Sequence, residues 1–80
     1  MRISPVMDRQ ALEERLKVAK AHVALDRESL RRRQEIVLEL ERARRDTSEA
    51  NRLLQQALDL EAFDVAEMER LTAELAKLQK

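Results

Sequence analysis

The only histidine, His22, is the first residue whose type could support chemistry, either as a phosphate acceptor on a helical bundle or as a metal ligand. A metal site needs several ligands close together, and the chain has neither a second histidine nor a cysteine. A group of acidic residues lacks the Glu-x-x-His motifs that di-iron bundles place on facing helices. We therefore favour a surface histidine without a special role and a solvated acidic helix face. The acidic residues are Asp59, Glu61, Asp64, Glu67 and Glu69.

Arginines form the most prominent charged feature, and they could contact phosphates of nucleic acid or of anionic lipid. Consecutive arginines point around a helix instead of along one side, and nearby glutamates balance them. No aromatic side chains are interleaved with them, since Phe63 is the only aromatic residue. A solvated face is the favoured interpretation, and nucleic-acid binding is the weaker hypothesis. The arginines are Arg31, Arg32, Arg33, Arg42, Arg44 and Arg45.

The composition excludes several other classes of site. The chain of 80 residues has no glycine, which excludes phosphate-cradling loops, and no cysteine, which excludes disulfides and thiolate nucleophiles. A helical hairpin would enclose no pocket from which water is excluded. We therefore expect no enzymatic activity, no catalytic residue and no metal or other cofactor.

The sequence also lacks the signals of a membrane or secreted protein. No apolar run approaches the roughly 18 residues that span a bilayer. The first residues lead into charged sequence without the apolar core of a signal peptide. We expect a cytoplasmic protein that makes no contact with membranes.

Two helical segments would have to position all of these residues, within a single domain over residues 1–80. Ser4 followed by Pro5 is typical of a helix start, and nothing breaks the helical pattern for forty residues afterwards. The polar stretch that follows contains Asp46 and Glu49, which have the spacing of a capping box. The pattern predicts a first helix over about 5–44, a turn over about 44–47 and a second helix over about 48–79. The alternative is one uninterrupted helix of about 70 residues in a long coiled coil.

The apolar residues of both segments recur at helical spacing and cover about half of each helix circumference. A stripe of roughly 100° is sufficient for a helix that contacts one surface, so a wider band indicates more than one neighbour. The sequence therefore predicts an all-α, coiled-coil-like antiparallel two-helix hairpin that dimerises into a four-helix bundle. The residues expected to carry this core and interface are Leu12, Leu16, Val23, Leu30, Val37, Leu54, Leu58, Val65, Met68 and Leu75.

Charges indicate how the two segments pair. Residues 1–45 carry 12 basic and 8 acidic side chains, whereas residues 46–80 carry 4 basic and 8 acidic ones. Folding the chain back at Asp46 pairs residues whose numbers add to about 94, and this sets Arg33 against Glu61. Both residues stand where leucine would be expected, so we predict an ion pair that fixes the register.

The chain contains a series of short, spaced segments: His22-Val23, Gln34-Glu35-Ile36-Val37, Leu40-Glu41-Arg42, Asp46-Thr47, Ala50, Leu53-Leu54, Arg70-Leu71 and Glu74-Leu75. Together they resemble a group of short, stand-alone, uncharacterised bacterial proteins, over roughly residues 8–75. The resemblance implies a two-helix hairpin with no catalytic residue and no ligand. That group has glycine where this chain has Arg44. Glycine would supply the left-handed conformation that ends a helix, and arginine adopts it at a cost of about 1 kcal/mol or more.

These observations favour a non-enzymatic interaction or scaffold protein that forms a homodimer and offers its remaining face to another helical protein. One alternative is a small nucleic-acid-binding regulator that uses the arginine cluster. Another is a chaperone-like adaptor for a helical client.

Overall fold

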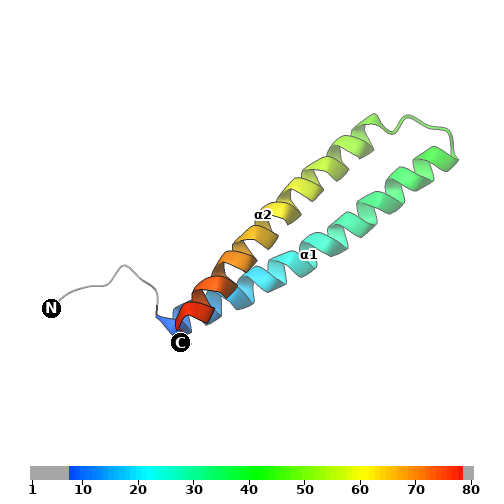
Figure 1. Cartoon of the computed structure of the whole chain (residues 1–80). Coiled ribbons are helices and arrows are strands. Elements are labelled where there is room, and N and C mark those ends of the chain that lie inside the picture. The colour runs from blue at the N-terminus through cyan, green and yellow to red at the C-terminus, as the bar shows by residue number, and fades with distance from the viewer. Residues whose placement is uncertain (1–7, 79–80) are drawn as a thin grey trace.

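A computed structural model describes residues 8–78 of the chain, which form two long helices packed side by side in opposite directions (Figure 1). Helix α1 spans Arg9–Arg42, helix α2 spans Ser48–Leu78, and residues 43–47 connect them. The prediction of an all-α two-helix hairpin is confirmed, and the alternative of one uninterrupted helix is wrong.

Helix α1 begins after an aspartate cap. Asp8 has an extended backbone (φ −74°, ψ 174°), and its carboxylate accepts a hydrogen bond of 2.8 Å from the Ala11 backbone amide. A side-chain oxygen at this position satisfies one of the amides that a helix start leaves free. The predicted start signal, Ser4 and Pro5, lies outside the described residues. Because Asp8 is extended, α1 starts at Arg9 and not near residue 5.

Helix α1 ends at Arg42 in a Schellman motif without glycine. Arg44 has a φ of 56°, the left-handed conformation. The Arg45 amide donates to the Leu40 carbonyl at 2.9 Å, and the Arg44 amide donates to the Glu41 carbonyl at 3.0 Å. These are the two hydrogen bonds that define the motif. Arg44 therefore adopts the conformation for which glycine is better suited, and α1 ends two residues before the predicted boundary.

Helix α2 begins differently from the predicted capping box. The Asp46 carboxylate accepts hydrogen bonds from the backbone amide (2.9 Å) and hydroxyl (2.7 Å) of Ser48, and these bonds lower the pKa of Asp46. Glu49, the expected second member of the box, pairs with Arg52 instead. The aspartate thus fixes the connection, while the glutamate contributes to the helix surface.

The core lies along the inner stripes of the two helices. Five apolar residues of α1 are buried, but only two of α2. At the end of the hairpin that carries the chain termini, Leu12, Ala19, Leu71 and Leu75 form one cluster, against which Leu16 and Met68 pack. Among residues 8–78 no polar or charged residue is buried. The other buried residues are Val23, Leu30 and Val37.

Candidate interaction surface

The residues expected to carry the core and interface occupy three environments. Leu12, Val23, Leu30, Val37 and Leu75 are buried within one hairpin. Leu58 is 39% exposed, although it belongs to the same predicted stripe. The half-buried members of the predicted set are Leu16, Leu54, Val65 and Met68.

The predicted register pair is replaced by another. Glu61 forms an ion pair of 3.2 Å with Arg27 and not with Arg33, so the paired residues have numbers that add to 88. The prediction placed the reversal about three residues too far along the chain, since a sum of 94 centres it on residue 47 and a sum of 88 centres it on residue 44. Arg33 instead lines a depression nearer to the turn, together with Ile36 and Leu53.

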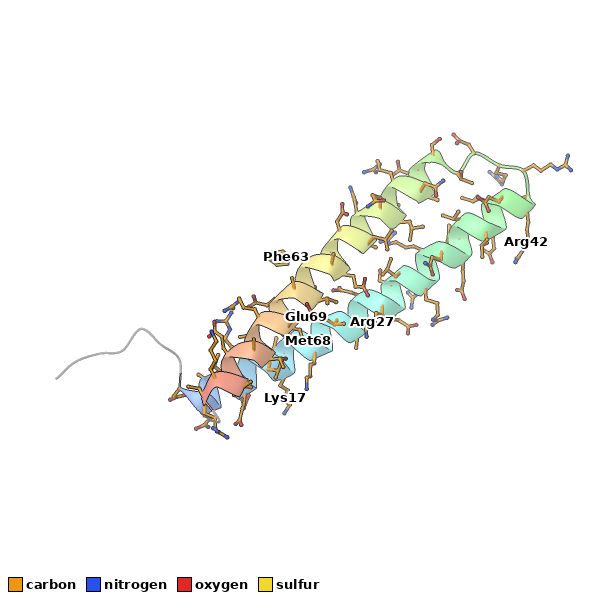
Figure 2. All side chains as sticks on the ribbon, viewed as in Figure 1. Lys17, Arg27, Arg42, Phe63, Met68 and Glu69 are labelled. Atoms are coloured by element: carbon orange, nitrogen blue, oxygen red, sulfur yellow. The ribbon has the colours of Figure 1, made fainter. Side chains whose placement is uncertain are left out.

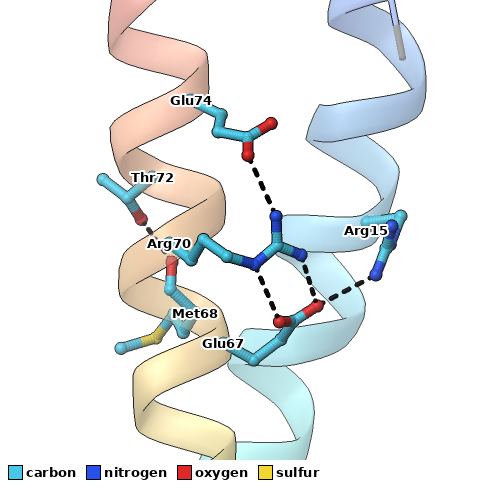
Figure 3. Close-up of polar contacts among 6 residues, drawn as sticks. All are labelled: Arg15, Glu67, Met68, Arg70, Thr72 and Glu74. Atoms are coloured by element: carbon cyan, nitrogen blue, oxygen red, sulfur yellow. Dashed lines mark hydrogen bonds and ion pairs between the residues drawn. The ribbon is translucent and has the colours of Figure 1, made fainter. Parts of the chain in front are cut away.

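A second ion pair between the helices belongs to a larger network (Figure 3). The Arg15 guanidinium donates to Glu67 Oε2 at 2.9 Å, and Arg70 donates to both oxygens of Glu67, at 3.0 and 3.2 Å. Arg70 also donates to Glu74 at 3.0 Å. Hydrogen bonds from Arg70 hold the pKa of Glu67 below its ordinary value. The network connects α1 with α2 beside the buried cluster, but its exposure limits its contribution to stability.

The arginines considered for anion binding do not converge on one site. Arg31 is engaged within its own helix, where it pairs with Glu28 and with Glu35. Arg42 lies at the end of α1 near the turn (Figure 2), and Arg44 follows in the turn itself. The other members of the set, Arg32 and Arg45, are also exposed.

The centre of the hairpin holds a small polar group. His22, Asp26 and Asp64 line one open depression together with Leu25 and Leu60. A hydrogen bond with Asp64 and partial burial raise the pKa of Asp26. The Oδ2 atom of Asp26 is buried without a hydrogen-bond partner among the described residues. Within residues 8–78, no three histidine, cysteine or acidic side chains are grouped so that they could hold a metal ion.

Large apolar side chains remain exposed on two opposite sides of the hairpin. Val18, Leu25, Ile36 and Leu60, which we call the first face, are 42–68% exposed. At 100° per residue, Leu38 and Leu58 point about 200° away from Ile36 and Leu60, so they belong to a second face. Neither described helix has an apolar stretch long enough to cross a membrane.

Shallow, mostly apolar depressions make the first face continuous. One depression is lined by Val18 and His22, and the next one is lined by His22, Leu25 and Leu60. Leu25 also lines a third depression together with Ile36, which in turn lines a fourth with Leu53. Neighbouring depressions share residues along α1, and three of the four are also lined by α2.

We find no match to this chain among protein-family models, curated proteins or solved structures. The described residues offer an extended apolar surface.

The sequence reasoning missed several residues that connect the helices. Leu71 is 1% exposed, but it was not among the residues expected to carry the core. The pairs of Arg15 with Glu67 and of Arg27 with Glu61 were missed because the register was displaced. A fold-back centred on residue 45, midway between the two helix ends, would have brought these residues closer together.

Proposed function

We propose that this chain is a non-enzymatic, cytoplasmic protein–protein interaction or scaffold module that self-associates through its apolar helix faces. The observation that carries the proposal is the exposure of eight large apolar residues, between 39% and 72%, on a two-helix hairpin. Four of them, the first face, line a series of neighbouring depressions. Exposed apolar area of this kind, arranged in one contiguous patch, marks interaction sites.

The energetics of a small chain favour association. A domain of this size buries only about 60% of its unfolded surface and is marginally stable by itself. Complete burial of one leucine side chain contributes about 1.5–3 kcal/mol. Two hairpins packed as a four-helix bundle would cover apolar side chains that one hairpin leaves in water.

The alternatives have weaker support. For a nucleic-acid-binding regulator, the arginines are divided between a helix surface, where Arg31 is paired with glutamates, and the turn. A chaperone-like adaptor would use the same apolar faces for a helical client. The resemblance to short bacterial helical-hairpin proteins suggests neither a ligand nor a client.

The solution mass tests the proposal most directly. We expect sedimentation equilibrium over a wide concentration range to show a dimer of twice 9.4 kDa that dissociates on dilution. The thermal midpoint should rise with protein concentration, because association stabilises the folded state by mass action. A species of 9.4 kDa with a concentration-independent midpoint would contradict the proposal.

Nucleic-acid binding is tested separately by gel retardation at low salt. The regulator hypothesis expects retardation that weakens steeply as salt is added, because bound phosphates release counterions. We expect no retardation of DNA or RNA. Salt-sensitive binding that is lost when Arg31, Arg32 and Arg33 are neutralised would favour the regulator.

A further inference from the structure

We infer that the first face binds a second copy of this chain with α1 of each hairpin on α2 of the other and both turns at the same end. In this arrangement the two-fold axis runs parallel to the helices between the two hairpins. The inference rests on the proposed self-association and assigns its surface and its orientation.

The position of the first face around each helix suits a four-helix bundle. Val18, Leu25 and Ile36 are separated by seven and eleven residues, so they return to one side of α1. That side lies roughly 100° from the buried stripe of Leu30 and Val37. In a four-helix bundle each helix contacts two neighbours at approximately right angles. The exposed stripe of α1 therefore points to where a second neighbour would lie.

Helix α2 presents a matching stripe. Leu60 is 54% exposed and Leu53 is half-buried, and they lie seven residues apart on the same side. Phe63 follows Leu60 by three residues and stands at the outer edge of this stripe, where it points away from α1 (Figure 2). Its 72% exposure is unfavourable in a lone hairpin. A second helix above α2 would contact this edge.

Two hairpins can stack through the first face either with α1 on α2 or with like helices on each other, and the charges of the helices favour the first arrangement. Helix α1 carries nine basic and seven acidic residues, whereas α2 carries three basic and seven acidic ones. Stacking α2 on α2 brings together two helices of net negative charge. Stacking α1 on α2 brings together helices of opposite sign. Complementary potentials of this kind set orientation and suppress the alternative pairing.

The chosen axis also places compatible side chains opposite one another. Because the two-fold axis runs parallel to the helices, it leaves the position of a residue along the hairpin unchanged. Residues at one position along the first copy, which we call a level, therefore meet residues at the same level of the second copy. Leu25 and Leu60 share a depression and hence a level, so Leu25 would meet Leu60 of the second copy. His22 and Asp64 share this level too. His22 would therefore meet a carboxylate of the second copy at the centre of the interface.

The available area is sufficient for a stable dimer. The 31 residues of α2 extend over roughly 46 Å, since each residue rises 1.5 Å. Two helices side by side are about 20 Å wide. The resulting face is on the order of 900 Å² for each copy, close to the roughly 800 Å² that a standard interface buries on each side.

Introduced cysteines test the orientation, because the natural chain contains none. Leu25→Cys and Leu60→Cys replace exposed residues, so both variants should keep the helical far-ultraviolet spectrum. When the two variants are mixed, exchanged and oxidised in a thiol redox buffer, we expect disulfide-linked heterodimers between residues 25 and 60. Each variant by itself should remain largely unlinked, because its two cysteines lie diagonally across the bundle.

Other patterns would overturn the inference. Efficient linkage of Leu25→Cys with itself, or of Leu60→Cys with itself, indicates like helices stacked on each other. Linkage of the second-face variants Leu38→Cys and Leu58→Cys, without linkage of the first-face pair, indicates the opposite surface. A dimer that links in none of these samples also contradicts the assigned geometry.

The mass measurement separates this inference from the proposed function. If the unmodified chain is a monomer at every concentration, self-association itself fails. If it is a dimer with a different linkage pattern, self-association stands and only the orientation fails. As a second variant, Leu60→Lys should weaken the dimer at least tenfold, whereas Leu58→Lys on the second face should change the dissociation constant less than threefold. Equal weakening by both variants would contradict the assignment of the first face.

Discussion

The two ends of the hairpin are held together in different ways. At the end with the chain termini, both helices contribute buried side chains, and the charged network of Arg15, Glu67 and Arg70 spans the helices. At the turn end, α2 contributes no buried residue among those described, although α1 buries Val37. There the chain is ordered by local hydrogen bonds around Asp46.

This difference shows that packing and chain reversal can be encoded in separate regions. Leucines of α2 at the terminal end contact α1 directly. Near the turn, Leu53 and Leu54 are only half-buried, and Leu60, towards the centre of the hairpin, is exposed. The turn end therefore keeps exposed apolar surface, while local hydrogen bonds define where the helices stop and start.

Truncation of buried leucine should give the largest difference between the two ends. Leu71→Ala removes a side chain that is 1% exposed, and we expect it to lower the free energy of unfolding by about 2–5 kcal/mol. Leu54→Ala, in the half-buried part near the turn, should cost less than half as much. Urea unfolding followed by circular dichroism at one protein concentration measures both. Equal losses would show that the two ends are packed equally well.

Replacing Asp46 and Asp8 tests how far local hydrogen bonds stabilise each end of the hairpin. Asp46→Ala removes the acceptor for the amide and hydroxyl of Ser48, and should destabilise the hairpin because these hydrogen bonds order the connection. Asp8→Ala removes the cap of α1, where the first helical turn can fray without separating the helices. It should therefore cost less in the same urea experiment. A larger loss for Asp8→Ala would mean that the turn end does not depend on its cap.

Glycine substitution in the turn tests the left-handed residue. Arg44→Gly should stabilise the hairpin by about 0.5–1 kcal/mol, because glycine adopts the φ of 56° without the steric cost of a Cβ atom. Ala43→Gly is the matched control, since Ala43 has a φ of −84° and gains nothing from glycine. The control should be destabilised by about 0.5–1 kcal/mol. Thermal melts that rank these two variants in the opposite order would contradict the assigned turn conformation.

We expect the smallest effect on stability from Asp26 and Asp64, the two carboxyl groups at the centre of the hairpin. The pKa of Asp26 is raised above 3.8 by its hydrogen bond with Asp64 and by partial burial, and it also experiences opposing charges from His22 and Glu61. A raised carboxyl pKa favours the folded state at low pH, and this contribution is lost as the pH rises through the raised value. Asp26→Asn should therefore gain a small amount of stability relative to the natural chain as the pH rises from below the ordinary pKa of a carboxyl group towards neutrality.

Paired urea titrations across this pH range measure the difference between Asp26→Asn and the natural chain. Taking the difference removes the contribution of Asp46, whose lowered pKa acts in the opposite direction in both proteins. A gap that is constant with pH would show that Asp26 and Asp64 do not share a proton in the folded state.

Much of the fold could be predicted because it depends on local sequence. The spacing of Leu12, Val23, Leu30 and Val37 identified the buried stripe of α1, and all four are buried. The expectation of a left-handed residue at position 44 came from the resemblance and not from the local sequence, and Arg44 adopts that conformation. The register was not predictable to within one helical turn, because the length of the connection shifts every pair between the helices. Arg27 consequently replaced Arg33 as the partner of Glu61.

The sequence alone determined two amphipathic helices and a reversal between them, since helix periodicity, capping residues and the polar gap act over a few neighbouring positions. Only the tertiary structure decided which side of each apolar band is covered. That outcome depends on how two helices with wide apolar bands lie against each other. Leu71 is buried in the contact between them, whereas Leu58 is exposed to solvent. The exposed groove along Leu25 and Leu60 is a result of that choice.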